Sequence, residues 1–155
     1  MTKLLFLDID ETLNNTSRPS FPNEGSSIHQ PLDPQNLKAL HMILDAVPDA
    51  GIVITSVWRK TIDSLEAMRW RLLCEDIPPH RVVGLTPVLA SGIRGEEIAS
   101  WLMLTGGLSV TSYVIIDDSS DAGCGLIDQE RFIKVSPTTG LTQDDAKKAI
   151  EILLR

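Results

Sequence analysis

The chain has few of the residues that build disulfide frameworks or membrane spans. Its 155 residues include only two cysteines, and aromatic residues make up 5%. Cys74 and Cys124 lie far apart and form no pairing pattern, so we expect no disulfide and a reducing, cytoplasmic location. No apolar run is long enough to cross a bilayer, and the first run is too short for a signal peptide. We therefore expect no membrane association.

Basic charge is also scarce. Fourteen Lys and Arg residues face 21 Asp and Glu residues, which gives a formal net charge of -7. Extended binding to nucleic acid or to an anionic membrane needs a basic face, so we expect neither. A local pocket for one phosphate group remains compatible with this charge. The length and the hydrophobic fraction of 43% are typical of a single globular domain, here residues 1–155.

Apolar runs that read as buried strands alternate with helical patterns along the chain. The strands are expected at residues 4–7, 51–55, 81–85, 113–116 and 131–135. This alternation predicts an α/β fold with a doubly wound, parallel, five-stranded sheet.

The helices between these strands carry recognisable start and stop signals. Asp33-Pro34 is an N-cap followed by proline, and this first helix should end near Val47. The second helix is expected to open at Trp58 and to end before Pro78-Pro79. The third should start at Glu96 and end at Gly106-Gly107, and Thr142 with Asp145 forms a capping box for the last.

Apolar residues at helical spacing define the expected inner faces. Those of the second helix are Ile62, Leu65, Leu72 and Leu73, and those of the last helix are Ala146, Ala149, Ile150, Leu153 and Leu154. Residues 14–31 show no such pattern and are rich in Pro, Ser and Asn. A segment of this length beside an acidic stretch favours a flap, or a minimal loop cap, over a site.

Polar residues close three of the five expected strands. They are Asp8 and Asp10 after the first, Thr55 and Ser56 after the second, and Asp117 and Asp118 after the fourth. The carboxyl ends of parallel strands share one edge of the sheet, where such folds bind their ligands. Carboxylates gathered there can hold a divalent cation, attack an electrophile, or do both.

The order of these residues resembles the haloacid dehalogenase-like (HAD) superfamily of phosphohydrolases, which have a Rossmann-like fold. Asp8-Ile9-Asp10-Glu11-Thr12 is similar to the first HAD motif, Thr55 to the second, Arg94 to the third and Asp117-Asp118 to the fourth. More narrowly, the stretches 54–59, 94–98, 114–118 and 140–142 resemble the small HAD domains of Swiss Army Knife RNA repair proteins. Glu11 departs from the pattern because many members have glycine there, and Arg94 because lysine is commoner.

The resemblance implies a Mg²⁺-dependent phosphatase that works through an aspartyl phosphate. Asp8 would be the nucleophile and Asp10 the general acid and base. Asp8, Asp118 and the backbone carbonyl of Asp10 would hold the metal, and Asp117 would orient the basic residue or a metal-bound water. Asp117 and Asp121 are the alternatives to Asp118 as the third metal ligand.

The remaining implied roles concern the substrate. Thr55 and Ser56 would hold the phosphoryl oxygens, with backbone amides at the start of the second helix. Arg94 would clamp the phosphate. Arg59 is a further candidate substrate contact, and Thr12 a supporting residue. The substrate is a phosphate ester, with nucleotide or nucleic-acid-end phosphates favoured.

Two other readings stay open. A phospho-accepting receiver domain also has a doubly wound sheet with an acidic pocket, although there the acidic pair follows the first strand, not the fourth. A non-catalytic HAD-fold binding module is the second alternative. The role of Glu11 and the oligomeric state are not decided by the sequence.

Overall fold

The computed structural model describes residues 2–17, 27–105 and 110–155. Five strands form one sheet in which every neighbouring pair is parallel, in the order β3-β2-β1-β4-β5. They are β1 (Thr2–Leu7), β2 (Ala50–Ile54), β3 (Val82–Leu85), β4 (Val110–Asp117) and β5 (Phe132–Lys134). The predicted α/β class and the five-stranded parallel sheet are confirmed.

The central strand β1 is apolar on both faces. Leu4, Leu5, Phe6 and Leu7 are fully buried. Leu5 and Leu7 belong to the larger of two cores, whereas Leu4 and Phe6 belong to the smaller one. The alternation of side chains along a strand sends neighbours to opposite faces, so both faces of the sheet must be covered.

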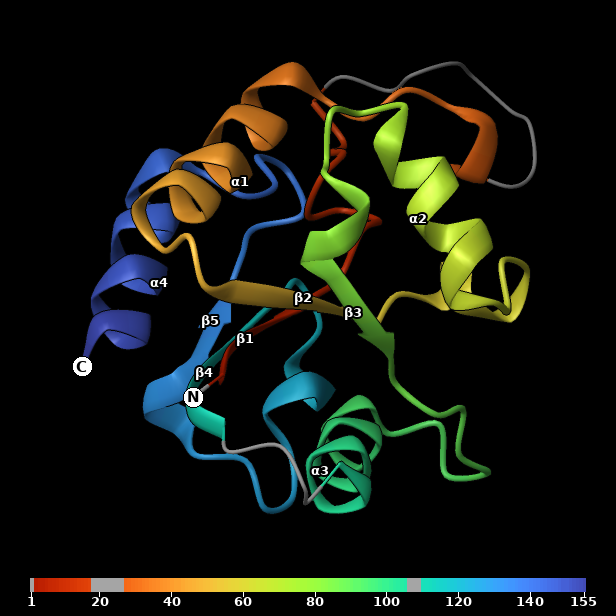
Figure 1. Cartoon of the computed structure of the whole chain (residues 1–155), viewed down its shortest axis with the longest axis vertical. Helices are drawn as coiled ribbons and strands as arrows, with labels where there is room; N and C mark the ends of the chain where they lie inside the picture. The colour runs from red at the N-terminus through yellow and green to blue at the C-terminus, as the bar shows by residue number, and fades with distance from the viewer. Residues whose placement is uncertain (1, 18–26, 106–109) are drawn as a thin grey trace.

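Three α-helices cover one face of the sheet and one helix covers the other (Figure 1). The three are α1 (Pro34–Ala46), α2 (Leu65–Leu73) and α4 (Gln143–Leu154), and the single one is α3 (Arg94–Leu104). The predicted caps are present: Asp33 accepts a hydrogen bond from the Gln35 N–H at 2.8 Å, and Thr142 and Asp145 form a capping box.

The second helix differs from the prediction. Only a short 3-10 helix, η2 (Val57–Lys60), forms at Trp58, and α2 starts later, at Leu65. Ser64 is the reason for the new start, because its side chain accepts a hydrogen bond from the Ala67 N–H at 3.1 Å. The residues that α2 buries also differ from the prediction.

Two residues expected inside lie outside. Leu73 is 40% exposed and Leu154 is 57% exposed. In α2 the buried positions are Met68 and Leu72, four residues apart, and Leu73 lies beyond this stripe. In α4 the buried residues are Ala146, Ala149, Ile152 and Leu153. Ile152 is therefore buried, whereas Leu154, which was expected inside, is exposed.

The segment that follows the acidic stretch is attached to the body of the fold before residue 18. The Thr16 N–H donates to the Pro137 carbonyl at 3.0 Å, and the Ser17 hydroxyl donates to the Thr138 carbonyl at 2.6 Å. Residues 18–26 of the expected flap, and Gly106-Gly107, lie outside the described residues. A flap within a single domain therefore stays a prediction.

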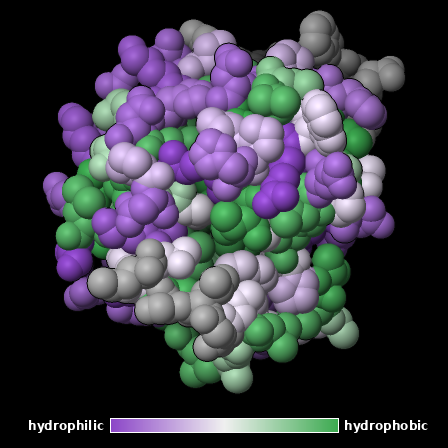
Figure 2. Space-filling model, in the orientation of Figure 1, coloured by the Kyte–Doolittle hydropathy of each residue, from purple (hydrophilic) through white to green (hydrophobic). Residues whose placement is uncertain are grey.

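Hydrophobic side chains reach the surface in several places. Figure 2 shows one gathering near the bottom of the view, in the region of α3. Met103 and Leu104, at the end of α3, are 76% and 79% exposed. None of the helices in the described ranges has the length and apolar character that a bilayer crossing needs.

The start of α2 can be tested by removing its cap. Ser64→Ala should lower the free energy of unfolding by about 1 kcal/mol, because one N–H group of the first turn loses its acceptor. Urea denaturation measures this change. Thr61→Ala is the control and should cost less than about 0.5 kcal/mol, since Thr61 lies before the helix. A neutral Ser64→Ala, with a costly Thr61→Ala, would place the helix start earlier than the structure does.

Candidate active site

The strand order reverses between β1 and β4, which is where open α/β sheets form their ligand crevice. Asp8 follows β1 directly, and Asp117 is the last residue of β4. The two ends are joined, because the Asp8 N–H donates to the Ile116 carbonyl at 3.1 Å. Thr55 enters the same edge from β2, through its N–H on the Leu7 carbonyl at 3.0 Å.

This strand order also separates the fold from a receiver domain. Receiver domains have the flavodoxin-like order 2-1-3-4-5, in which the reversal falls between the first and third strands. Here the order is 3-2-1-4-5. The receiver-like alternative is therefore not supported by the topology.

An acidic cluster lies at this edge of the sheet. One carboxylate oxygen from each of Asp8, Asp117 and Asp118 lies within 4.8 Å of the other two. Asp8 and Asp117 are buried, and Asp118 is half-buried. Carboxylate oxygens are the ligands of hard cations, so the set is chemically suited to a divalent metal.

Asp121, an alternative metal ligand in the sequence analysis, forms hydrogen bonds within the fold. Its carboxylate accepts hydrogen bonds from the Ser119 hydroxyl and from the Arg94 N–H, the latter at 3.1 Å. These contacts hold the first turn of α3. Asp117 is also engaged, since it accepts from the Ser119 N–H at 2.8 Å and from Arg94.

Arg94 is the cation of the cluster. Its Nη1 lies 2.6 Å from Asp117 Oδ2 and 3.2 Å from Asp8 Oδ1. Arg94 is the first residue of α3, and the next residue, Gly95, lets this end of the helix approach η4 (Ser120–Gly123). A Cβ at Gly95 would collide with the Cys124 carbonyl oxygen, so this close approach requires glycine. The sequence reasoning did not assign Gly95 a role.

The carboxylates repel one another and are removed from water. Burial raises the pKa of Asp8 well above its ordinary value, the charge of Asp117 raises it further, and Arg94 offsets part of the rise. Burial also raises the pKa of Asp117 to about 6, although Arg94 acts in the opposite direction. One guanidinium therefore does not compensate the buried negative charge completely.

Two buried hydroxyls lack partners among the described residues. They are the Oγ1 atoms of Thr55 and Thr12, and both residues are fully buried. A buried hydroxyl without a hydrogen bond is costly, and such a group at a crevice is commonly satisfied by a ligand or water. Ser56 is occupied in capping, because its hydroxyl accepts from the Trp58 N–H at 3.2 Å.

Arg59 does not face the cluster as a free cation. Its side chain is buried and forms an ion pair with Glu97 of α3. It also donates to the carbonyls of Thr55 and Ser56, and to that of Thr86 at 3.0 Å. Its donors are thus engaged by the protein, which corrects the expectation that Arg59 contacts substrate. It instead ties the Thr55 turn to the helix that carries Arg94.

Three further arginines are likewise engaged by the main chain. Arg69 donates to the Val82 carbonyl at 2.8 Å, Arg71 to the Ile28 carbonyl at 2.6 Å, and Arg81 to the Ala50 carbonyl at 2.8 Å. These hydrogen bonds attach loops and strand ends to the rest of the fold.

Asp10 is half-buried at the edge of the cluster. Its Oδ1 accepts hydrogen bonds from Trp58 Nε1 and from Asn14 Nδ2, each at 3.1 Å. The sequence motifs assign neither Trp58 nor Asn14 a role at the site. The indole ring of Trp58 lies in the larger core, and its N–H reaches Asp10.

Glu11 adopts a left-handed backbone conformation with φ of 61°. Glycine adopts this conformation without strain, whereas other residues do so at a cost. The side chain is exposed, and its carboxyl shares a hydrogen bond with Asp118, which raises the pKa of Glu11. This backbone geometry gives a physical reason for glycine at this position in many HAD proteins.

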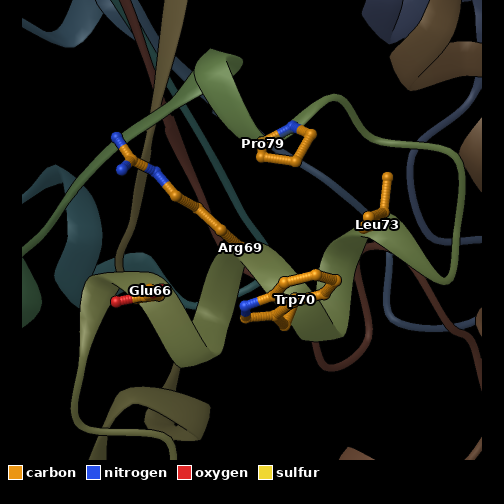
Figure 3. Close-up of a pocket in the computed structure, with 5 residues that line it drawn as sticks. All are labelled: Glu66, Arg69, Trp70, Leu73 and Pro79. Carbon is orange, nitrogen blue, oxygen red and sulfur yellow. The ribbon is translucent and has the colours of Figure 1, made fainter.

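A separate groove lies beside α2, and none of the acidic cluster residues line it. It has a volume of about 430 Å³ and is lined by Glu66, Arg69, Trp70, Leu73 and Pro79. Figure 3 shows Trp70, Leu73 and Pro79 around this hollow, with Arg69 extending away from the indole ring. Trp70 is 65% exposed, as expected for a tryptophan outside the core.

Comparison with known families identifies the class of protein. A family model described as "HAD domain in Swiss Army Knife RNA repair proteins" matches residues 4–146. The match covers most of the chain, and the chain belongs to this family. No curated protein and no solved structure matches it. The resemblance noted in the sequence motifs is thereby confirmed.

The Arg59–Glu97 pair should contribute strongly to stability. Arg59→Met leaves Glu97 buried without its partner, so the free energy of unfolding should fall by about 3–5 kcal/mol. Denaturation of Arg59→Met, Glu97→Gln and the double variant should give a coupling energy above about 1 kcal/mol. The exposed pair Lys147–Asp144 is the control, and Lys147→Ala should cost less than about 0.5 kcal/mol. Additive effects of Arg59→Met and Glu97→Gln would contradict the assigned pair.

The raised pKa of Asp117 predicts a pH dependence of stability in metal-free protein. The pKa is about 6 in the folded state against an ordinary value of 3.8, so the folded state retains a proton that the unfolded state has lost. The contribution of Asp117 to the free energy of unfolding is therefore fully present below pH 4 and is lost as the pH rises to 6. It amounts to at most about 3 kcal/mol.

Urea denaturation in EDTA across pH 4–8 measures this contribution as the stability of the wild-type chain minus that of Asp117→Asn. The difference should fall between pH 4 and 6 and then become level. A difference that rises with pH would show that the ion pair with Arg94 outweighs burial.

Proposed function

We propose that the chain is a Mg²⁺-dependent phosphomonoester hydrolase that works through an aspartyl phosphate on Asp8. The observation that carries the proposal is one edge of the sheet with a carboxylate cluster, a guanidinium and a buried hydroxyl without a partner among the described residues. A phosphate group needs these three kinds of partner: a nucleophile, a countercharge and hydrogen-bond donors. Membership of the HAD family supports the same reaction class.

Asp8 performs the first step. One of its carboxylate oxygens forms a bond to phosphorus, while the bond from phosphorus to the ester oxygen breaks and its electron pair leaves with that oxygen. Arg94 contacts Asp8 at 3.2 Å, so it keeps the nucleophile in place and offsets the charge that gathers during attack. The Thr55 hydroxyl donates to a phosphoryl oxygen.

Asp10 handles the proton. It donates a proton to the departing ester oxygen in the first step. In the second step it takes a proton from water, whose oxygen bonds to phosphorus as the bond to Asp8 breaks. Inorganic phosphate leaves, and both carboxylates return to their starting states.

The metal is assigned from the donor set. Asp8 and Asp118, with the backbone carbonyl of Asp10, would hold Mg²⁺, and Asp117 would keep Arg94 oriented through its 2.6 Å contact. The all-oxygen cluster fits this ion, and burial together with the charge of Asp117 raises the pKa of Asp8 despite the contact with Arg94. When bound, Mg²⁺ would neutralise the phosphate oxygens beside the carboxylates.

The substrate class follows from charge. The chain is acidic, and Arg59, Arg69, Arg71 and Arg81 are engaged within the fold, which disfavours an extended grip on a nucleic-acid strand. An open site with at most a small loop cap would admit a bulky substrate by its phosphate end. The family's description as a domain of RNA repair proteins favours a nucleotide or a nucleic-acid end. The site acts as a phosphomonoesterase on such ends.

The proposal predicts hydrolysis of p-nitrophenyl phosphate that requires Mg²⁺ and stops in EDTA. Asp8→Asn should lower kcat at least about a thousandfold, because it removes the nucleophile. Thr55→Val keeps the shape but removes the hydroxyl, and should lower kcat/KM by about 10–1,000-fold. Released nitrophenolate measures both effects.

Thr111→Val is the matched control, since Thr111 is exposed on β4 away from the carboxyl edge. It should leave turnover unchanged. A wild-type rate no higher than that of Asp8→Asn, across nucleotides, sugar phosphates and phosphorylated oligonucleotide ends, would favour the non-catalytic binding module instead.

A further inference from the structure

Two N–H donors from different parts of the chain converge on one oxygen of Asp10. Trp58 Nε1 and Asn14 Nδ2 each lie 3.1 Å from Asp10 Oδ1. An indole nitrogen can only donate, and an amide nitrogen can only donate. Both lone-pair positions of Oδ1 are therefore taken by donors, which leaves Oδ2 as the oxygen that can carry a proton.

The orientation of the Asn14 amide is fixed by the backbone. The Glu11 N–H donates to Asn14 Oδ1 at 2.5 Å. A backbone N–H cannot accept a hydrogen bond, so the oxygen of the amide must face Glu11 and the nitrogen must face Asp10. The left-handed conformation of Glu11 belongs to the same tight turn.

Trp58 is held as firmly from the other side. It is 2% exposed within the larger core, and the Arg71 guanidinium lies 5.0 Å above its ring. Arg71 is in turn bonded to the Ile28 and Gln30 carbonyls, at 2.6 and 2.7 Å. An indole packed in this way cannot swing away from Asp10 without disturbing the core.

We infer that Trp58 and Asn14 are positioning residues that hold the Asp10 carboxyl group by Oδ1, so that Oδ2 is the oxygen that exchanges a proton with the departing oxygen. The inference rests on the proposed function, in which Asp10 is the general acid. A buried indole N–H needs an acceptor, and here that acceptor is the Asp10 carboxylate and not a carbonyl of the core. Together with the Asn14 amide it holds Asp10 by one oxygen and leaves the other, Oδ2, for proton transfer.

This role has a kinetic signature that packing does not share. Protonation matters most when the leaving oxygen is strongly basic, as in ethyl phosphate, and little when it is nitrophenolate. Trp58→Phe keeps an aromatic ring but removes the N–H, and Asn14→Ala removes the second donor from a half-buried position. Each should lose about tenfold or more in kcat/KM on ethyl phosphate, but less than about threefold on p-nitrophenyl phosphate, because kcat/KM reports the first step and not the second step that both substrates share.

Trp101→Phe is the matched control, because Trp101 is 8% exposed in the other core and its ring packs on Phe6 at 5.6 Å. It should show no difference between the two substrates. Equal losses on both substrates in Trp58→Phe and Asn14→Ala, or no loss in either, would overturn the inference while turnover by the wild-type chain upholds the proposed function. A wild-type chain without turnover on either substrate would overturn both.

The contact itself has a readout that does not need activity. The chain has three tryptophans, so its ¹H–¹⁵N spectrum should hold three indole cross-peaks, and the one missing in Trp58→Phe is that of Trp58. Asp10→Ala should move this peak upfield and leave those of Trp70 and Trp101 in place. An unmoved Trp58 peak would contradict the hydrogen bond on which the inference depends.

Discussion

The site depends on the placement of several carboxylates together at the carboxyl ends of β1 and β4. Asp8 and Asp117 are buried there, and Asp118 lies beside them. Carboxylates in such a place oppose folding unless positive charge offsets them. Arg94 supplies one positive charge through its contacts with Asp8 and Asp117, and burial keeps the pKa of both acids raised in spite of these contacts. In the proposed function, a divalent cation held by these carboxylates would supply the further positive charge.

Much of the surrounding architecture holds Arg94 and the Thr55 turn in place. Gly95 allows the first turn of α3 to lie against η4, and Asp121 accepts the Arg94 N–H. The buried Arg59–Glu97 pair links the same helix to the turn after β2. The cation and the unsatisfied hydroxyl are therefore mounted on elements that are tied to each other, as preorganised sites require.

The parts of the fold that could be predicted from the sequence rest on local patterns. The apolar run before Asp8, the Asp33-Pro34 cap and the Thr142–Asp145 box each involve residues within a few positions of one another, and each formed as expected. The candidate site could be assembled because each of its acids follows a buried strand. Arg59 could not be placed, since its role depends on Glu97, 38 residues away. The contact of the Trp58 indole with Asp10 could not be predicted either, because a buried ring and a ring with a site-facing N–H have the same sequence signature.

The central claim is that Asp8 becomes phosphorylated during turnover. Rapid acid quench of the wild-type chain with Mg²⁺ and p-nitrophenyl phosphate, followed by borohydride reduction, converts an acyl phosphate to an alcohol that peptide mass spectrometry can locate. The account predicts a reduced residue at Asp8 that requires substrate and is absent in Asp8→Asn. Turnover without modification of Asp8, or with modification at another acid of the cluster, would contradict it.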